Sequence, residues 1–262
     1  MNIDREKVKK VFAEYVRHYD VEDTKIRLKI LHTYKVSELC EEIALDLFST
    51  TVMRERTSAQ KEIDLAWLIG MLHDIGRFEQ VRRYHTLFDA ESVSHAALGT
   101  EILFEEGMLT RFIMAEPEDP DVGVLRAAIA YHSDYRIPGD LDERTRMFCQ
   151  ILRDADKIDI FRVNCETSLE DIYHITKEEL MHAEVSEDVM ENFMRRQATP
   201  REIRKTPVDY VVGMISMAFE LVYPISRKIA ARQGYLDHLL DFPSENEKTR
   251  RQFAMMKRYL AL

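Results

Sequence analysis

Glycine and proline are scarce in this chain. Its 262 residues include 8 glycines and 7 prolines, where average usage would supply about 18 and about 13. A barrel or sandwich of many short strands needs a turn-forming residue at nearly every connection, so the scarcity argues against that class. Apolar residues instead recur at helical spacing along almost the whole chain. We therefore predict an all-α fold, a single compact domain of many helices.

Cysteines and long hydrophobic runs are also few. The three cysteines, Cys40, Cys149 and Cys165, are spaced too widely for a disulfide framework or a CxxC metal site. The longest run without a charged residue, 210–219, has ten residues, whereas a bilayer span needs about 20. The first ten residues, MNIDREKVKK, contain no apolar signal region. These features predict a cytoplasmic protein that does not associate with a membrane.

Basic residues are outnumbered by acidic ones. There are 37 lysines and arginines against 47 aspartates and glutamates, a formal net charge of −10. This balance argues against a nucleic-acid duplex as a partner, although it leaves room for a local basic pocket. The composition makes no prediction of the oligomeric state.

Hydrophobic periodicity places the expected helices. They cover roughly residues 8–16, 25–48, 65–76, 92–106, 122–132, 143–163, 168–183, 186–196, 207–232 and 245–260. Proline-containing loops are expected at 115–121, 136–143, 198–207 and 241–248. We predict that residues 1–165 form the core and that residues 166–262 add further helices packed on the same unit.

Four of the nine histidines lie on apolar helix faces: His32, His73, His95 and His132. One such histidine is most simply a neutral core residue satisfied by hydrogen bonds. Four together, one beside Asp74, are harder to bury, since each unsatisfied polar group costs on the order of 2–7 kcal/mol. A metal ion would use their lone pairs directly. Imidazole with carboxylate, and no thiolate, favours Mn, Fe, Co, Ni or Zn.

The segment FCQILRDADKIDIF (148–161) offers a further carboxylate from a predicted helix. Asp154 and Asp156 fall on opposite flanks of its apolar face, and Asp159 falls nearer the centre. Periodicity therefore indicates that this helix presents an acid toward the core, and it leaves the choice among the three open.

These motifs together resemble the HD-domain superfamily of metal-dependent phosphohydrolases. The likeness rests on a histidine, a later HDIG in an apolar helix, and an aspartate in an Ala-Asp-Lys-Ile context, and it covers roughly residues 25–165. It implies an all-helical HD-type domain that binds a divalent metal. The ligands it implies are His32, His73, Asp74 and Asp156, with Asp154 as the alternative to the last.

Two further segments, SHAALGTEIL (94–103) and AIAYH (128–132), resemble the extra histidine segments of the subgroup that holds two metals. By this likeness His95 and His132 are ligands of a second ion. Other subgroups match less well, because the chain has no GYP motif and carries Arg77 where one subgroup has HDIGK. A nucleotide would be held by the metals and basic side chains, since the chain has neither GxxxxGK[ST] nor GxGxxG.

A basic segment, GRFEQVRRYHT (76–86), follows the HD doublet. Arg77 lies four residues after His73, which suits it to bind negative charge that develops on a phosphate. We predict that Arg77 acts in catalysis together with Asp74. Arg82 and Arg83 are expected on a loop, where they bind substrate phosphate or are simply solvated surface.

The function predicted from the sequence is metal-dependent hydrolysis of a phosphomonoester or phosphodiester. One or two divalent ions would activate a water as hydroxide, and the substrate would be a nucleotide or a related small phosphorylated metabolite. Two alternatives remain open: a di-iron oxygenase of HD type, and a metal-containing protein with a non-catalytic, interaction or regulatory role.

Overall fold

The computed structural model describes residues 1–49, 56–116, 118–167 and 175–260. Within these ranges the regular structure is helical, with one isolated β-bridge between Asn2 and Met114. The predicted all-α fold is therefore confirmed. No helix in the described ranges has the length and apolar character needed to cross a membrane. By its internal contacts the chain divides into two compact units, Met1–Ala155 and Asp156–Leu262, and the division falls inside one helix, α8.

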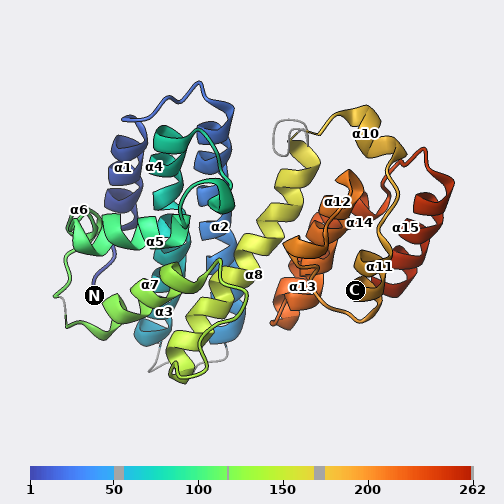
Figure 1. The fold of residues 1–262 in the computed structure, drawn as a ribbon. Coiled ribbons are helices and arrows are strands. Elements are labelled where there is room, and N and C mark those ends of the chain that lie inside the picture. Colours follow the sequence, from blue (N-terminus) through green and yellow to red (C-terminus); the bar gives the residue numbers. More distant parts are fainter. Residues whose placement is uncertain (50–55, 117, 168–174, 261–262) are drawn as a thin grey trace. The chain divides into compact units, whose positions relative to one another are not determined.

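The first unit is built from helices that lie side by side or cross one another (Figure 1). They are α1 (Arg5–Val16), α2 (Thr24–Phe48), α3 (Arg56–Leu72), α4 (Ile75–Tyr84), the 3₁₀ turn η2 (Asp89–Glu91), α5 (His95–Thr100), the π turn η3 (Glu101–Glu105), α6 (Leu109–Phe112), α7 (Pro120–Tyr131) and the start of α8 (Glu143–Glu166). Helix α2 packs along α3, while α5 packs against α4 and α7.

Local sequence explains where several of these helices begin. Asp4 precedes α1 and accepts a hydrogen bond from the Lys7 amide at 3.0 Å. Asp119 caps α7 in the same way, and Pro120 occupies the first position of that helix. A cap satisfies an otherwise unpaired amide, and proline has no amide hydrogen to leave unpaired there. These signals mark the two helix starts in the local sequence.

Two glycines allow the helices of the first unit to approach closely. A Cβ at Gly70 of α3 would lie 2.6 Å from the Cα of Ser37 in α2. A Cβ at Gly76 of α4 would lie 2.3 Å from the carbonyl oxygen of His95 at the start of α5. Both distances are far below van der Waals contact. Only glycine therefore permits these two crossings, which bring α2, α3, α4 and α5 together.

Arg144 of α8 links this helix to two others in the first unit. It makes a bidentate pair with Glu62 of α3, at 3.0 Å for both bonds, and contacts Asp121 of α7 at 2.6 Å. Part-exposed ion pairs contribute little stability, about 0–1 kcal/mol. The planar guanidinium does fix direction, so this contact orients the start of α8.

The second unit gathers around α12 (Pro207–Ser216), whose side chains are largely buried. Its other helices are the remainder of α8, α10 (Lys177–His182), α11 (Glu187–Met194), the 3₁₀ turn η4 (Arg201–Ile203), the 3₁₀ turn η5 (Met217–Glu220), α13 (Pro224–Gln233), α14 (Tyr235–Leu240) and α15 (Glu247–Leu260). Helix α12 contacts α10, α11 and α14, and α15 contacts α11 and α14. The first part of the helix expected over 168–183 lies outside the described residues.

A single helix over 207–232 was predicted, and this was wrong. The segment is α12, the turn η5 and then α13, with extended backbone at Leu221 and Tyr223. Pro224 explains the break, because its ring disfavours helical backbone in the residue before it and it carries no amide hydrogen. The Leu221 carbonyl is satisfied instead by Arg227, whose guanidinium donates to it at 2.6 Å.

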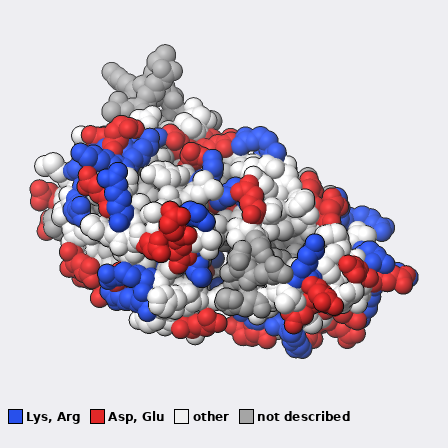
Figure 2. All heavy atoms as spheres, turned by 90° about the horizontal axis from the view of Figure 1, so that it is seen from above, with Lys and Arg blue, Asp and Glu red and all other residues white. Residues whose placement is uncertain are grey.

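Acidic and basic side chains alternate over the described part of the face in Figure 2. Neither sign forms a large continuous area there. This distribution agrees with a net charge of −10 that is spread along the sequence.

Candidate metal centre

His73 and Asp74 lie at the break between two helices rather than inside one. Helix α3 ends at Leu72 and α4 begins at Ile75, so the continuous helix expected through HDIG was wrong. Asp74 is the residue before α4, but its side chain makes no capping hydrogen bond. Its carboxylate faces the histidines instead. His73 and Asp74 are 0% and 2% exposed, so any charge here is shielded from water.

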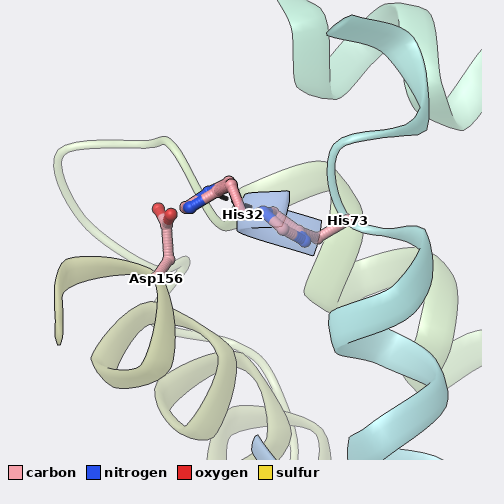
Figure 3. A group of neighbouring side chains, drawn as sticks. All are labelled: His32, His73 and Asp156. Atoms are coloured by element: carbon pink, nitrogen blue, oxygen red, sulfur yellow. Dashed lines mark hydrogen bonds between the residues drawn. The ribbon is translucent and has the colours of Figure 1, made fainter. Parts of the chain in front are cut away.

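The first group of candidate ligands is His32, His73 and Asp156 (Figure 3). Each offers one ligand atom, and these atoms all lie within 4.8 Å of one another. His32 comes from α2 and Asp156 from α8, immediately after Ala155. The Nε2 atoms of His32 and His73 are 3.4 Å apart. Figure 3 shows the Asp156 carboxylate directed toward the His32 ring.

The second group is Asp74, His95 and His132, all buried and again with ligand atoms within 4.8 Å. His95 is the first residue of α5, and His132 directly follows α7. Their Nε2 atoms are 2.9 Å apart. The Oδ1 atom of Asp74 lies 3.5 Å from His95 Nε2 and 3.9 Å from His132 Nε2.

Asp74 lies between the two groups. Its Oδ2 is 3.5 Å from His32 Nε2 and 3.4 Å from His73 Nε2, while its Oδ1 faces His95 and His132. One carboxylate thus presents a different oxygen to each histidine pair. This is the arrangement that a carboxylate needs to bridge two ions.

Hydrogen bonds fix which ring nitrogens carry protons. His73 Nδ1 lies 2.7 Å from the Gly70 carbonyl, and His132 Nδ1 lies 2.7 Å from the Ile129 carbonyl. A carbonyl only accepts, so both Nδ1 atoms donate, and in a neutral ring Nε2 then carries a lone pair. The Nε2 lone pair of His73 therefore faces His32, and that of His132 faces His95.

The spacing of these atoms fits a divalent metal ion. When two nitrogens bind the same ion at about 2.1 Å, they lie about 3.0 Å apart if the N–metal–N angle is a right angle. They lie about 3.4 Å apart if that angle is tetrahedral. The observed Nε2 separations are 2.9 Å between His95 and His132 and 3.4 Å between His32 and His73. Imidazole and carboxylate donors also suit Mn, Fe, Co, Ni or Zn. The residues present therefore fit such ions.

Neighbouring charges keep Asp74 ionised. Burial alone would raise the pKa of this carboxyl, but the charges of Lys29 and Arg77 outweigh it and hold the pKa well below its usual range. The strongest contact is Lys29 Nζ, 2.6 Å from Asp74 Oδ2. For His95 the balance favours the neutral ring, because burial and Arg77 lower its pKa despite Asp89. Both residues are thus in the protonation state that binds metal.

The predicted phosphate-binding arginines have partners within the protein. Arg77 Nη1 donates to Gln80 Oε1 at 2.8 Å, to the Leu87 carbonyl at 2.6 Å and to Asp89 Oδ1 at 2.7 Å. Its Nε lies 3.6 Å from Asp74 Oδ1, so Arg77 does stand beside the doublet.

Arg82 and Arg83 were expected on a loop, and this was wrong, since both belong to α4. Both form ion pairs with Glu79 and are 62% and 47% exposed. A role for either in binding phosphate stays a prediction.

The three aspartates of α8 have different surroundings. Asp156 belongs to the first ligand group. Asp159 makes a bidentate pair with Arg162, at 2.7 and 2.8 Å. Asp154 is fully buried. Among the described residues, the aspartate of α8 that joins a group of candidate ligands is therefore Asp156.

Three residues near the centre were missed by the sequence analysis: Lys29, Asp89 and Arg153. Lys29 had a usable signal, since it lies one helical turn before His32 and so shares its face. Asp89 comes from the short η2 turn and contacts His95 Nδ1 at 2.6 Å. Arg153 donates to backbone carbonyls at the end of α7. Side-chain periodicity gives no sign of either of the last two.

A sequence model of the HD domain matches residues 30–161, about half of the 262-residue chain. The matched range contains all six residues of the two ligand groups. Searches of curated proteins and of solved structures gave no match.

Proposed function

The chain belongs to the HD-domain family, whose members are generally metal-dependent hydrolases, and from that premise we propose that it is a two-metal phosphohydrolase. Its substrate is a phosphomonoester or phosphodiester of a small metabolite such as a nucleotide. The observation that carries the proposal is the position of Asp74, whose two oxygens face separate histidine pairs.

Each ion would have its own protein ligands. His32, His73 and Asp156 would hold the first ion and His95 and His132 the second, and Asp74, which lies beside both histidine pairs, would contribute to both. When bound, the metals lower the pKa of coordinated water and neutralise charge on phosphoryl oxygens. A structural metal site is normally closed by about four ligands, so two adjoining sites with a shared carboxylate favour a catalytic role.

The chain's own residues prepare the centre for this work. Lys29 and Arg77 keep Asp74 as a carboxylate, so no proton has to leave before metal binds. Lys29 is part-exposed, with 15% of its side chain accessible, and its ammonium is a strong partner for a substrate oxyanion. The Nη1 atom of Arg77 is already engaged by three acceptors. Arg77 therefore contributes its positive charge from the position that these hydrogen bonds fix.

The proposal is tested with purified protein that is supplied with Mn, Fe, Co, Ni or Zn. Metal content is measured first, and phosphate release is then assayed over a panel of nucleotides, other phosphomonoesters and phosphodiesters. We expect close to two ions per chain and hydrolysis that disappears with a chelator. Oxygen consumption with iron, and no hydrolysis with any metal, would instead support the oxygenase alternative.

The variant that tests the shared ligand is Asp74→Ala. We expect it to abolish hydrolysis and sharply lower metal content, because the charge of the ions loses its main compensation. The matched control is Glu38→Ala, which removes an exposed carboxylate of α2 and should retain both properties. Full activity in Asp74→Ala would end the phosphohydrolase proposal.

A further inference from the structure

The Nδ1 atoms of His73, His95 and His132 are held by hydrogen bonds of two different kinds. His73 and His132 each use the carbonyl three residues earlier, Gly70 and Ile129, which belongs to the helix that leads to them. His95 is the first residue of α5, so no turn of its helix precedes it. A side chain takes the place of that carbonyl. It is Asp89, with Oδ2 at 2.6 Å from His95 Nδ1.

Asp89 is itself held in one orientation by α4. Its Oδ1 accepts from Arg77 Nη1 at 2.7 Å and from Gln80 Nε2 at 3.0 Å. Gln80 is completely buried, and its amide also donates to Ser92 Oγ and to the Val93 carbonyl. Both donors therefore have fixed positions. With Oδ1 taken by them, Oδ2 is the oxygen presented to His95.

We propose that Asp89 is a positioning residue that selects the Nδ1–H tautomer of His95 and so directs the Nε2 lone pair at the second metal ion. A carboxylate only accepts hydrogen bonds, so the His95 nitrogen facing it must donate. The role of the ion rests on the proposed function, whereas the tautomer does not. Arg77 and Gln80 serve the same end by orienting Asp89. Such outer contacts typically change metal affinity about 10–100-fold.

Asp89→Asn separates this role from simple packing, because the side chain keeps its shape. Arg77 and Gln80 both donate at the Oδ1 position, so the amide oxygen should occupy it. The amide NH₂ then faces His95 Nδ1 and donates to it. The ring must accept at Nδ1 and carry its proton on Nε2, where the metal needs a lone pair.

The first measurement is the His95 tautomer in metal-free protein, read from ¹⁵N NMR shifts of the ring at neutral pH. The signal is assigned by its absence in His95→Gln. We expect Nδ1–H in the wild type and Nε2–H in Asp89→Asn. The matched control is Glu91→Gln, two residues along in the same turn, whose carboxylate contacts Thr86 rather than a histidine. It should keep Nδ1–H.

The second measurement is the number of ions per chain with added Mn. Asp89→Asn should fall from two ions to one, while Glu91→Gln should hold two. Retention of Nδ1–H in Asp89→Asn would overturn the proposal. An Nε2–H ring in the wild type would also overturn it, and this wild-type measurement does not depend on whether the variant folds. A wild type with Nδ1–H but without a second ion would sink the two-metal function and leave the tautomer assignment standing.

Discussion

The ammonium of Lys29 lies 2.6 Å from Oδ2 of Asp74, the oxygen that faces His32 and His73. Lys29 and Asp74 are 45 residues apart, and close packing of α2 on α3 brings them together. The lysine compensates the charge of a carboxylate that is buried from water. Its positive charge also stands beside the place where a divalent ion would bind. Lys29 should therefore stabilise Asp74 and oppose the first ion.

The first prediction concerns Lys29→Met. Removing the ammonium takes away a like charge next to the ion, so Mn should bind the His32–His73–Asp156 site more tightly, by about tenfold or more for a nearby buried charge. Titration of metal-free protein with Mn measures this. Lys29→Arg, which keeps the charge, is the control and should bind like the wild type. Weaker binding in Lys29→Met would mean that Lys29 mainly holds Asp74 in place.

The sequence predicted which histidines point inward, since helical periodicity alone defines the buried face of each helix. It did not predict from periodicity that His95 meets His132 at 2.9 Å, because that depends on how α5 and α7 cross. Only the family resemblance carried that expectation. The resemblance also selected Asp156, whereas the apolar pattern of α8 had left the choice among three aspartates open.

Two other features were beyond the reach of side-chain patterning. The apolar pattern resumes at Ile75 after His73 and Asp74, so nothing in it marked a break in the helix after Leu72. Asp89 acts from a three-residue turn, where no periodicity exists to assign a face. Both features depend on tertiary contacts, such as the approach of α4 to α5 that Gly76 permits.

The second prediction concerns the number of ions. With added Mn or Fe the wild type should hold about two ions per chain, and His95→Ala or His132→Ala should each hold about one. Activity should fall by orders of magnitude, because the missing ion shared the stabilisation of the phosphate. His182→Ala, which changes an exposed histidine, is the control. An unchanged single ion in all three proteins would point to a mononuclear centre.

The third prediction concerns Arg153, whose Nη1 donates to the carbonyls of Tyr131, His132 and Asp134. These carbonyls lie at the end of α7, where His132 sits. Arg153→Met removes the charged donor and should lower the free energy of unfolding by about 2–4 kcal/mol. Urea denaturation measures this, with the exposed Arg126→Met as the control. A loss below about 0.5 kcal/mol would show that water replaces the arginine without cost.

The last prediction concerns Glu79, which is 6% exposed and pairs with Arg82 Nη2 at 2.5 Å and with Arg83. Burial raises the pKa of this carboxyl, but the two arginines outweigh it and the pKa lies below its usual value. A carboxyl with a lowered pKa in the folded state stabilises the fold above its unfolded pKa of about 4.3, and this contribution disappears as the pH falls through the folded pKa. Glu79→Gln should therefore be less stable than the wild type at pH 7. Because the arginines are exposed, the difference in the free energy of unfolding should be at most about 1 kcal/mol. This difference should shrink below about pH 4.3. Urea denaturation at a series of pH values measures this against Glu38→Gln, an exposed carboxylate. A difference that grows on acidification would mean that Glu79 is protonated in the folded protein and that its burial, rather than its ion pairs, sets its pKa.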